Sequence, residues 1–185
     1  MVAAGVAAII ALVIGVAVGR SIIPSGPQRA APPEPAQFTD AEARIALTYP
    51  GTWRRLQSDD PQVRLLAAAG PETSLSLRVT KSELAAIKPE TLPIVRQLTD
   101  PLIAADDRAR QLSAPEAVSL PGLLGYRYRY RYTGQDGGTG AHVHYFLFKR
   151  GKMIQLVFQA VPATALPAVE PTFERIAATL RSTGG

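Results

Sequence analysis

Residues 126–161 read YRYRYRYTGQDGGTGAHVHYFLFKRGKMIQLVFQAV, and this stretch decides the fold class. Apolar and aromatic side chains recur at every second position in three of its segments, which is the pattern of β-strands. The glycine-rich segment 134–140 predicts a hairpin loop, and Arg150-Gly151 predicts a tight two-residue turn. We therefore expect three consecutive antiparallel strands, at Tyr126–Tyr132, Ala141–Lys149 and Lys152–Val161.

Further elements lie on both sides of this stretch. The same alternation predicts three more strands, at Arg44–Tyr49, Gln62–Ala69 and Thr73–Thr80. Helical spacing predicts a helix at Glu90–Ala105, which Pro101 should break, and a second helix near Pro171–Arg181. Helices that frame a run of antiparallel strands indicate an α+β domain.

Three short motifs accompany this order of elements. They are Tyr49-Pro50-x-x-Trp53, Pro121-Gly122-x-x-Gly125-Tyr126 and Phe173-x-x-Ile176-x-x-x-Leu180. With them the chain resembles the PsbP-like superfamily, most of all its bacterial anchored members. The resemblance implies an antiparallel sheet with helices on both sides, an α/β/α sandwich. It also implies an accessory or binding protein, since some members assist photosynthetic complexes and others bind a small GTPase, and it brings no shared catalytic residues.

The N-terminus predicts attachment to a membrane. Residues Val2–Val18 are uncharged and apolar, and about 1.5 Å per residue gives roughly 26 Å of helix, slightly less than the ~30 Å hydrocarbon core. A proline-rich segment follows at 24–35 and predicts a semi-stiff tether. The predicted organisation is a transmembrane anchor at 1–23, a linker at 24–37, one domain at 38–182 and a tail at 183–185.

The side of the membrane on which the domain lies is indicated less directly by the sequence than the anchor is. A cleaved signal peptide is the alternative to an anchor, but Arg20 follows the apolar run and no basic residue precedes it. Arg20 and Arg29 would favour a cytoplasmic domain by the positive-inside rule. The tether and the family resemblance favour an extracytoplasmic domain in the cell envelope, which is our expectation. The chain has no cysteine, so it lacks the residue on which the family's bacterial lipoprotein anchor is built.

The sheet hairpin supplies the candidate binding residues. The Arg150-Gly151 turn sets Tyr145 opposite Leu156, which gathers the apolar side chains of both strands on one face. Burying three arginines on that face without partners is prohibitive, so we expect the tyrosines there and the arginines on the polar face. The predicted partner-binding set is Arg127, Arg129, Arg131, His142, His144, Gln155 and Gln159.

This set predicts contact with an anionic partner, either a protein or another component of the envelope. The plainer alternative is that the arginines pair with nearby Asp or Glu residues or keep a strand soluble. The net charge of +5 alone does not indicate nucleic acid, because Lys and Arg are spread among acidic residues.

The sequence indicates metal binding and catalysis less strongly than it indicates a binding surface. His142-x-His144 has a spacing that could ligate zinc, which leaves a metal-assisted hydrolase as an alternative, with a structural subunit of a membrane complex as another. No third ligand can be named, so no metal, cofactor or catalytic residue is predicted. Asp59-Asp60 and Asp106-Asp107 are typical of turns and helix ends, and Trp53 is expected to pack under a helix.

Overall fold

The computed structural model describes residues 33–84, 87–134 and 137–184. Two helices, α1 (Leu92–Ala104) and α2 (Leu166–Thr179), each follow a short 3-10 turn, η1 (Pro89–Thr91) and η2 (Ala163–Ala165). The strands are β1 (Ala36–Asp40), β2 (Ile45–Tyr49), β3 (Arg54–Leu56), β4 (Val63–Ala68), β5 (Thr73–Lys81), β6 (Arg110–Gln111), β7 (Glu116–Leu120), β8 (Leu123–Thr133), β9 (Thr139–Lys149), β10 (Lys152–Ala160) and β11 (Arg181–Ser182). The predicted α+β class is confirmed.

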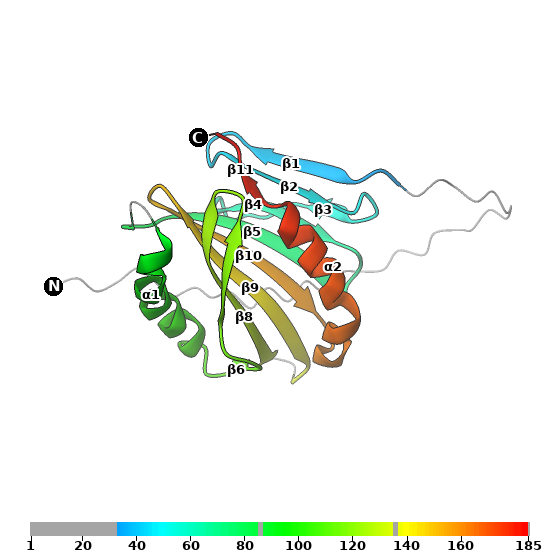
Figure 1. Ribbon diagram of the computed structural model, residues 1–185. Coiled ribbons are helices and arrows are strands. Elements are labelled where there is room, and N and C mark those ends of the chain that lie inside the picture. Colours follow the sequence, from blue (N-terminus) through cyan, green and yellow to red (C-terminus); the bar gives the residue numbers. More distant parts are fainter. Residues whose placement is uncertain (1–32, 85–86, 135–136, 185) are drawn as a thin grey trace, which may run out of the picture.

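The strands form a large and a small antiparallel sheet. The large one has the order β3-β4-β5-β10-β9-β8-β6, with β7 also paired to β8. The small one has the order β1-β2-β11 and joins the start of the described domain to its end. Figure 1 shows α1 and α2 on the two sides of the large sheet and the small sheet above it.

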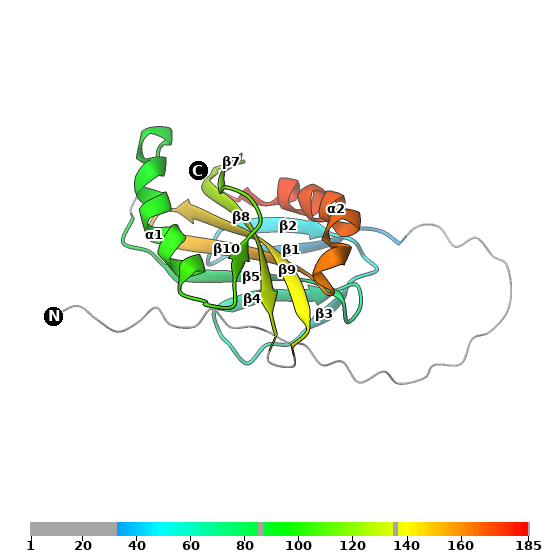
Figure 2. The same ribbon diagram turned by 90° about the horizontal axis from the view of Figure 1, so that it is seen from below.

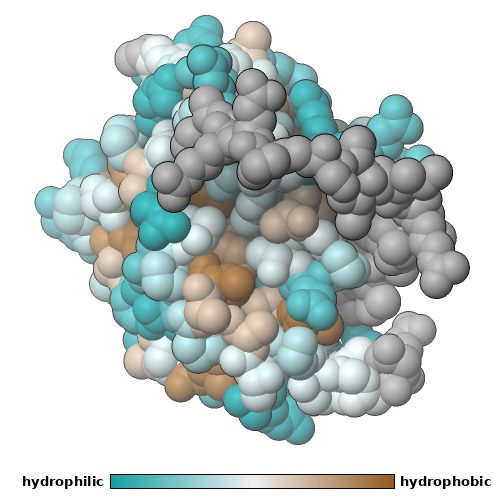
Figure 3. Space-filling view, turned by 90° about the vertical axis from the view of Figure 1, so that its right-hand side faces the viewer, coloured by the Kyte–Doolittle hydropathy of each residue, from teal (hydrophilic) through white to brown (hydrophobic). Residues whose placement is uncertain are grey.

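The two helices cover opposite faces of the large sheet, as Figure 2 shows from below. Under α2 lies the main core, in which Phe173 stacks on Phe158 with ring centroids 4.8 Å apart. Trp53 packs edge-to-face on Phe173, as expected for a core residue under a helix. Under α1 lies a smaller core that includes Tyr128 and Phe146. On the side shown in Figure 3, the visible described residues present small apolar groups between polar ones.

The predicted central strands and the tight turn are confirmed, including Tyr145 opposite Leu156. The expected break in the first helix is wrong, because α1 runs through Pro101 without interruption. Sequence patterns missed five short strands, which are β1, β3, β6, β7 and β11.

The expected face of the arginines is also wrong. In the β8–β9 pairing Arg127 lies opposite Tyr145 and Tyr128 lies opposite His144, so the arginines share the α2 face and the tyrosines the other. The prediction assumed that the arginines would lack partners on the apolar face. Glutamates at the edge of that face provide them, as described below.

No helix in the described part of the chain is long and apolar enough to cross a membrane. The predicted anchor Val2–Val18 and most of the proline-rich segment lie outside the described residues.

Candidate functional site

The predicted binding set divides between the two faces of the large sheet. Arg127 and Arg129 lie on the α2 face, and Arg131 is exposed and lies opposite Arg110 at the sheet edge. His142, His144, Gln155 and Gln159 lie together on the other face, where they line a pocket. The predicted set therefore forms two separate structural features, one on each face of the large sheet.

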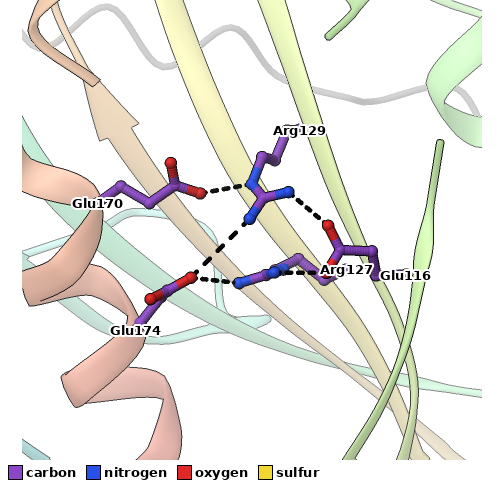
Figure 4. A network of polar contacts seen from close by, with 5 residues as sticks. All are labelled: Glu116, Arg127, Arg129, Glu170 and Glu174. Atoms are coloured by element: carbon purple, nitrogen blue, oxygen red, sulfur yellow. Dashed lines mark hydrogen bonds and ion pairs between the residues drawn. The ribbon is translucent and has the colours of Figure 1, made fainter. Parts of the chain in front are cut away.

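The first structure is an ion-pair cluster between β8, β7 and α2 (Figure 4). Arg127 donates to Glu174 at 2.7 Å and also to Glu116, while Arg129 bonds Glu116 and Glu170. Burial alone would lower the pKa of Arg127, but hydrogen bonds to Glu116, Tyr145 and Glu174 raise it overall. The hydrogen bond from Arg127 is the largest of the effects that keep the pKa of Glu116 below its ordinary value. These two arginines thus fix α2 and β7 to the sheet rather than forming an unpaired cationic patch.

The second structure is a polar pocket on the face that α1 covers only in part. Its floor is part of three adjacent cross-strand rows, which follow directly from the strand register. One row reads Tyr130, His142, Gln159, Ser74; the next reads Tyr128, His144, Val157, Ser76; the third reads Tyr126, Phe146, Gln155, Arg78. The cavity has a volume of about 110 Å³ and lies over these rows except at Tyr126, Tyr128 and Phe146.

The wall of this pocket comes from the loop between β3 and β4. Ser58 and Asp60 lie there, and Asp60 forms an ion pair with Arg78 of the floor. On the same face α1 lies beside the pocket, and Tyr128 ties it to the sheet by hydrogen bonds to Asp100 at 2.6 Å and Thr99 at 2.5 Å. Because Asp60 and Arg78 neutralise each other, the pocket has no net charge from this pair.

With the amide of Gln159 oriented as in the structure, the hydrogen bonds fit one arrangement of protons on the ring nitrogens. Gln159 Oε1 lies 3.3 Å from His142 Nε2, and a carbonyl oxygen only accepts, so His142 Nε2 carries the proton. His142 Nδ1 then accepts from the Tyr130 hydroxyl at 3.0 Å. That hydroxyl has donated its hydrogen, so it accepts from His144 Nδ1 at 3.3 Å. His144 is therefore protonated at Nδ1, and its Nε2 presents a lone pair.

The Nε2 atom of His144 is the unusual group of the pocket. It is buried and has no hydrogen-bond partner among the described residues. Gln155 lies near enough to raise the pKa of His144, against the larger lowering by burial, but makes no hydrogen bond of acceptable geometry to Nε2. An unpaired buried acceptor costs about 1–3 kcal/mol, so it calls for an explanation.

Both histidines are neutral at physiological pH. Burial lowers the pKa of His142 to about 4. Burial, followed by the repulsion of His142, lowers the pKa of His144 to about 3. Burial likewise raises the pKa of Tyr130. The pocket floor therefore recognises ligands by hydrogen bonds rather than by charge.

The hydrolase alternative finds little support in this geometry. The described residues contain no group of three side chains that could hold a metal ion. His142 has both nitrogens engaged, and Ser76 lies two strands from His144, at about 10 Å, with Val157 between them. His144 therefore does not lie within hydrogen-bonding reach of that serine.

Sequence reasoning missed several residues of the pocket. Tyr130, Ser74, Ser76, Arg78 and Asp60 line it, although none was a predicted site residue. Ser74, Ser76 and Arg78 alternate with Leu75, Leu77 and Val79, so their common face was visible in the sequence. Its position beside His142 and His144 depended on the pairing of β5 with β10, which the sequence did not show.

Comparisons with known proteins bear on the fold. No family model matches the chain, and no curated protein matches its sequence. The solution structure of cyanobacterial PsbP (CyanoP) from Synechocystis matches 85% of this chain and 98% of its own, with a TM-score of 0.58 and 14% identity. The chain has a PsbP-like fold.

Two further structures share the PsbP-like fold. LpqN of Mycobacterium tuberculosis, which is involved in cell envelope biogenesis, matches 82% of this chain and 91% of its own, with a TM-score of 0.58 and 16% identity. The Ran-binding protein Mog1p of Saccharomyces cerevisiae matches 81% of this chain and 96% of its own, with a TM-score of 0.52 and 6% identity. The PsbP-like domain thus spans nearly the full length of each of these structures.

Proposed function

We propose that the chain is a non-catalytic binding module of the cell envelope whose ligand site is the pocket on the sheet face opposite α2. The observation that carries the proposal is the lone pair of His144 Nε2, which is buried in the pocket without a partner. A ligand that donates a hydrogen bond to this atom removes the cost of leaving it unpaired.

The chemistry of the pocket defines the ligand group. A neutral hydroxyl or amide N–H donates to His144 Nε2 and meets Gln155, Gln159 and the serine hydroxyls, which can both donate and accept. A carboxylate has no hydrogen to donate to a lone pair, and the floor histidines are neutral. The pocket therefore selects a small neutral polar group, either free or part of a larger partner.

The envelope location rests on different support. Val2–Val18 is long enough to anchor the chain, and the proline-rich segment after it suits a spacer between the membrane and the domain. LpqN, which shares the fold, is involved in envelope biogenesis, and Mog1p binds a protein partner. We accordingly place the domain outside the cytoplasm, with protease cleavage of the tether in intact cells as the test.

The arginines take a different part in this proposal. Arg127 and Arg129 stabilise the position of α2, and the members of the predicted set that line the ligand pocket are His142, His144, Gln155 and Gln159. Contact of the arginines with an anionic partner stays a prediction, with Arg131 as the arginine of the three that is exposed.

The test uses simple probes of each hydrogen-bonding class. Acetamide and glycerol are neutral donors, whereas acetate is an acceptor, and the side-chain nitrogen resonances of His144 report contact directly. We expect the Nε2 resonance to move with acetamide or glycerol and not with acetate. His144→Phe should abolish the response of neighbouring amides, while Tyr126→Phe, under α1 on the same face, should retain it. An equal response to acetate, or none to the neutral probes, would contradict the proposal.

A further inference from the structure

Five basic residues gather at one end of the large sheet, away from the pocket. Lys81, Lys152 and Lys149 lie directly opposite one another in one row across β5, β10 and β9. Arg150 follows in the β9–β10 turn, and Lys149 Nζ lies 3.4 Å from the backbone oxygen of Arg44, in the β1–β2 turn. We call these five residues the basic cluster; three separate segments of the sequence contribute to it, which are the β1–β2 turn, the end of β5 and the β9–β10 hairpin.

The basic cluster has little internal compensation. No described carboxylate makes an ion pair with any of the five. Glu42 lies nearby, since its backbone oxygen accepts from Lys152 at 2.7 Å, but its carboxylate pairs with Arg64. Burial, then the charges of Arg150, Arg44 and Lys152, lower the pKa of Lys149. Like charges directly opposite each other on neighbouring strands destabilise a sheet, so this row is unfavourable without an anion.

Two of the five residues also occupy strained backbone positions. Arg44 has φ of 53° and Arg150 has φ of 46°, which is the left-handed region that favours glycine. They are the only non-glycine residues with positive φ among those that the structure describes. Glycine would suit both turns better, so the backbone conformation does not account for the arginines at these positions.

A hollow of about 450 Å³ adjoins the basic cluster. Lys149, Arg150 and Ser182 form its polar side, whereas Ile87, Leu124 and Phe148 give it apolar walls. Cations beside an apolar hollow suit a partner that carries carboxylates next to an apolar side chain.

We propose that the basic cluster and this hollow bind an acidic segment of a protein partner, with carboxylates on the lysine row and an apolar side chain in the hollow. In an extended chain, side chains two residues apart lie on the same face and are about 6.8 Å apart. The lysines of the row are about 4.8 Å apart from strand to strand, and the lysine and glutamate side chains are long enough to make up the difference. A nucleic-acid duplex engages phosphates over a larger face than five cations at strand ends. The basic cluster and the hollow lie away from the pocket, so this proposal can be tested separately from the proposed function.

The test is a double variant that removes charge without damaging the fold. Arg44→Gly with Arg150→Gly removes two cations and relieves both positive-φ positions, so its unfolding midpoint should rise. The matched control Arg54→Ala with Arg175→Ala removes two exposed arginines elsewhere. The probe is a fluorescein-labelled peptide of alternating glutamate and leucine, followed by fluorescence anisotropy at low salt.

We expect the glycine variant to bind the peptide at least about tenfold more weakly than the unchanged protein, and the control to bind within about twofold of it. The affinity of the unchanged protein should fall with added salt. Equal binding by the glycine variant would overturn the proposal. Tighter binding to vesicles that contain phosphatidylglycerol, or to duplex DNA, would overturn the assignment to an acidic protein segment in favour of a membrane or nucleic acid.

Discussion

Lowering the pH from 7 to 5 should destabilise this domain through its two histidines. The chain contains two histidines, and the pKa values of both are lowered by burial, to about 4 for His142 and about 3 for His144. In the unfolded chain each returns to the ordinary value of 6.5. As the pH falls below 6.5, the unfolded state therefore binds protons that the folded state does not, and the stability of the fold decreases.

The size of this effect follows from the two pKa values. At pH 5 the unfolded histidine is almost fully protonated and the folded one almost fully neutral, which costs about 2 kcal/mol per histidine relative to pH 7. The pair gives about 4 kcal/mol, a large share of the 5–15 kcal/mol that is typical of a domain. The pKa of Glu116 is lowered from 4.5, so this carboxyl titrates below the range from pH 7 to 5 and does not mask the effect of the histidines.

Urea unfolding at pH 7, 6 and 5 and constant ionic strength measures the effect. The free energy of unfolding should fall steadily across this range, and His144→Phe should reduce the fall to about half because one histidine remains. Tyr126→Phe, which alters the same sheet face without removing a histidine, should leave it unchanged. A free energy that stays constant from pH 7 to 5, with both histidines of the folded protein titrating near 6.5, would refute the reasoning.

Two further predictions test the packing that positions the site. Gly125→Ala should lower the free energy of unfolding by several kcal/mol or prevent folding, because a Cβ there would lie 1.8 Å from the backbone oxygen of Phe146. The control Gly70→Ala has open space around the new Cβ, so urea unfolding should show almost no change in stability. Glu116→Gln should cost about 1 kcal/mol, since Glu116 accepts from both Arg127 and Arg129 but is itself half exposed, and this difference from the unchanged protein should shrink in high salt. A salt-independent loss on Glu116→Gln would indicate altered packing rather than lost ion pairs.

The parts of the fold that were predictable are those fixed over short distances. The two-residue turn at Arg150-Gly151 sets the register of β9 against β10, so the faces of that hairpin followed from the alternation alone. The loop before β9 is longer and leaves the register of β8 open, and a shift by one residue exchanges the tyrosines for the arginines. The sequence showed that the arginines would need partners, but not that Glu170 and Glu174 of α2 would supply them.

The candidate site was predictable to the same extent. The histidines and glutamines were expected on one face because they belong to the predictable hairpin, and they do share it. Ser74, Arg78 and Asp60 join them only through the pairing of β5 with β10 and of β4 with β5, and both β4 and β5 are distant in sequence from the β9–β10 hairpin. The basic cluster could not be predicted for the same reason, since its residues come from three segments that only the two sheets together bring to one end.

The polar floor of the pocket is difficult to explain by stability alone. α1 packs over Tyr128 and Phe146 and could have continued an apolar face across the sheet, as α2 does on the other side. Instead the next positions are His142, His144, Gln155 and Gln159, and the buried Nε2 of His144 has no partner among the described residues. His144 already stacks on Phe146 at 3.8 Å, so a phenylalanine in its place would keep the ring contact and remove the unpaired atom. That change would also remove the hydrogen bond between His144 and Tyr130, but stability alone gives no reason for a buried Nε2 without a partner, and this supports the ligand site that we propose.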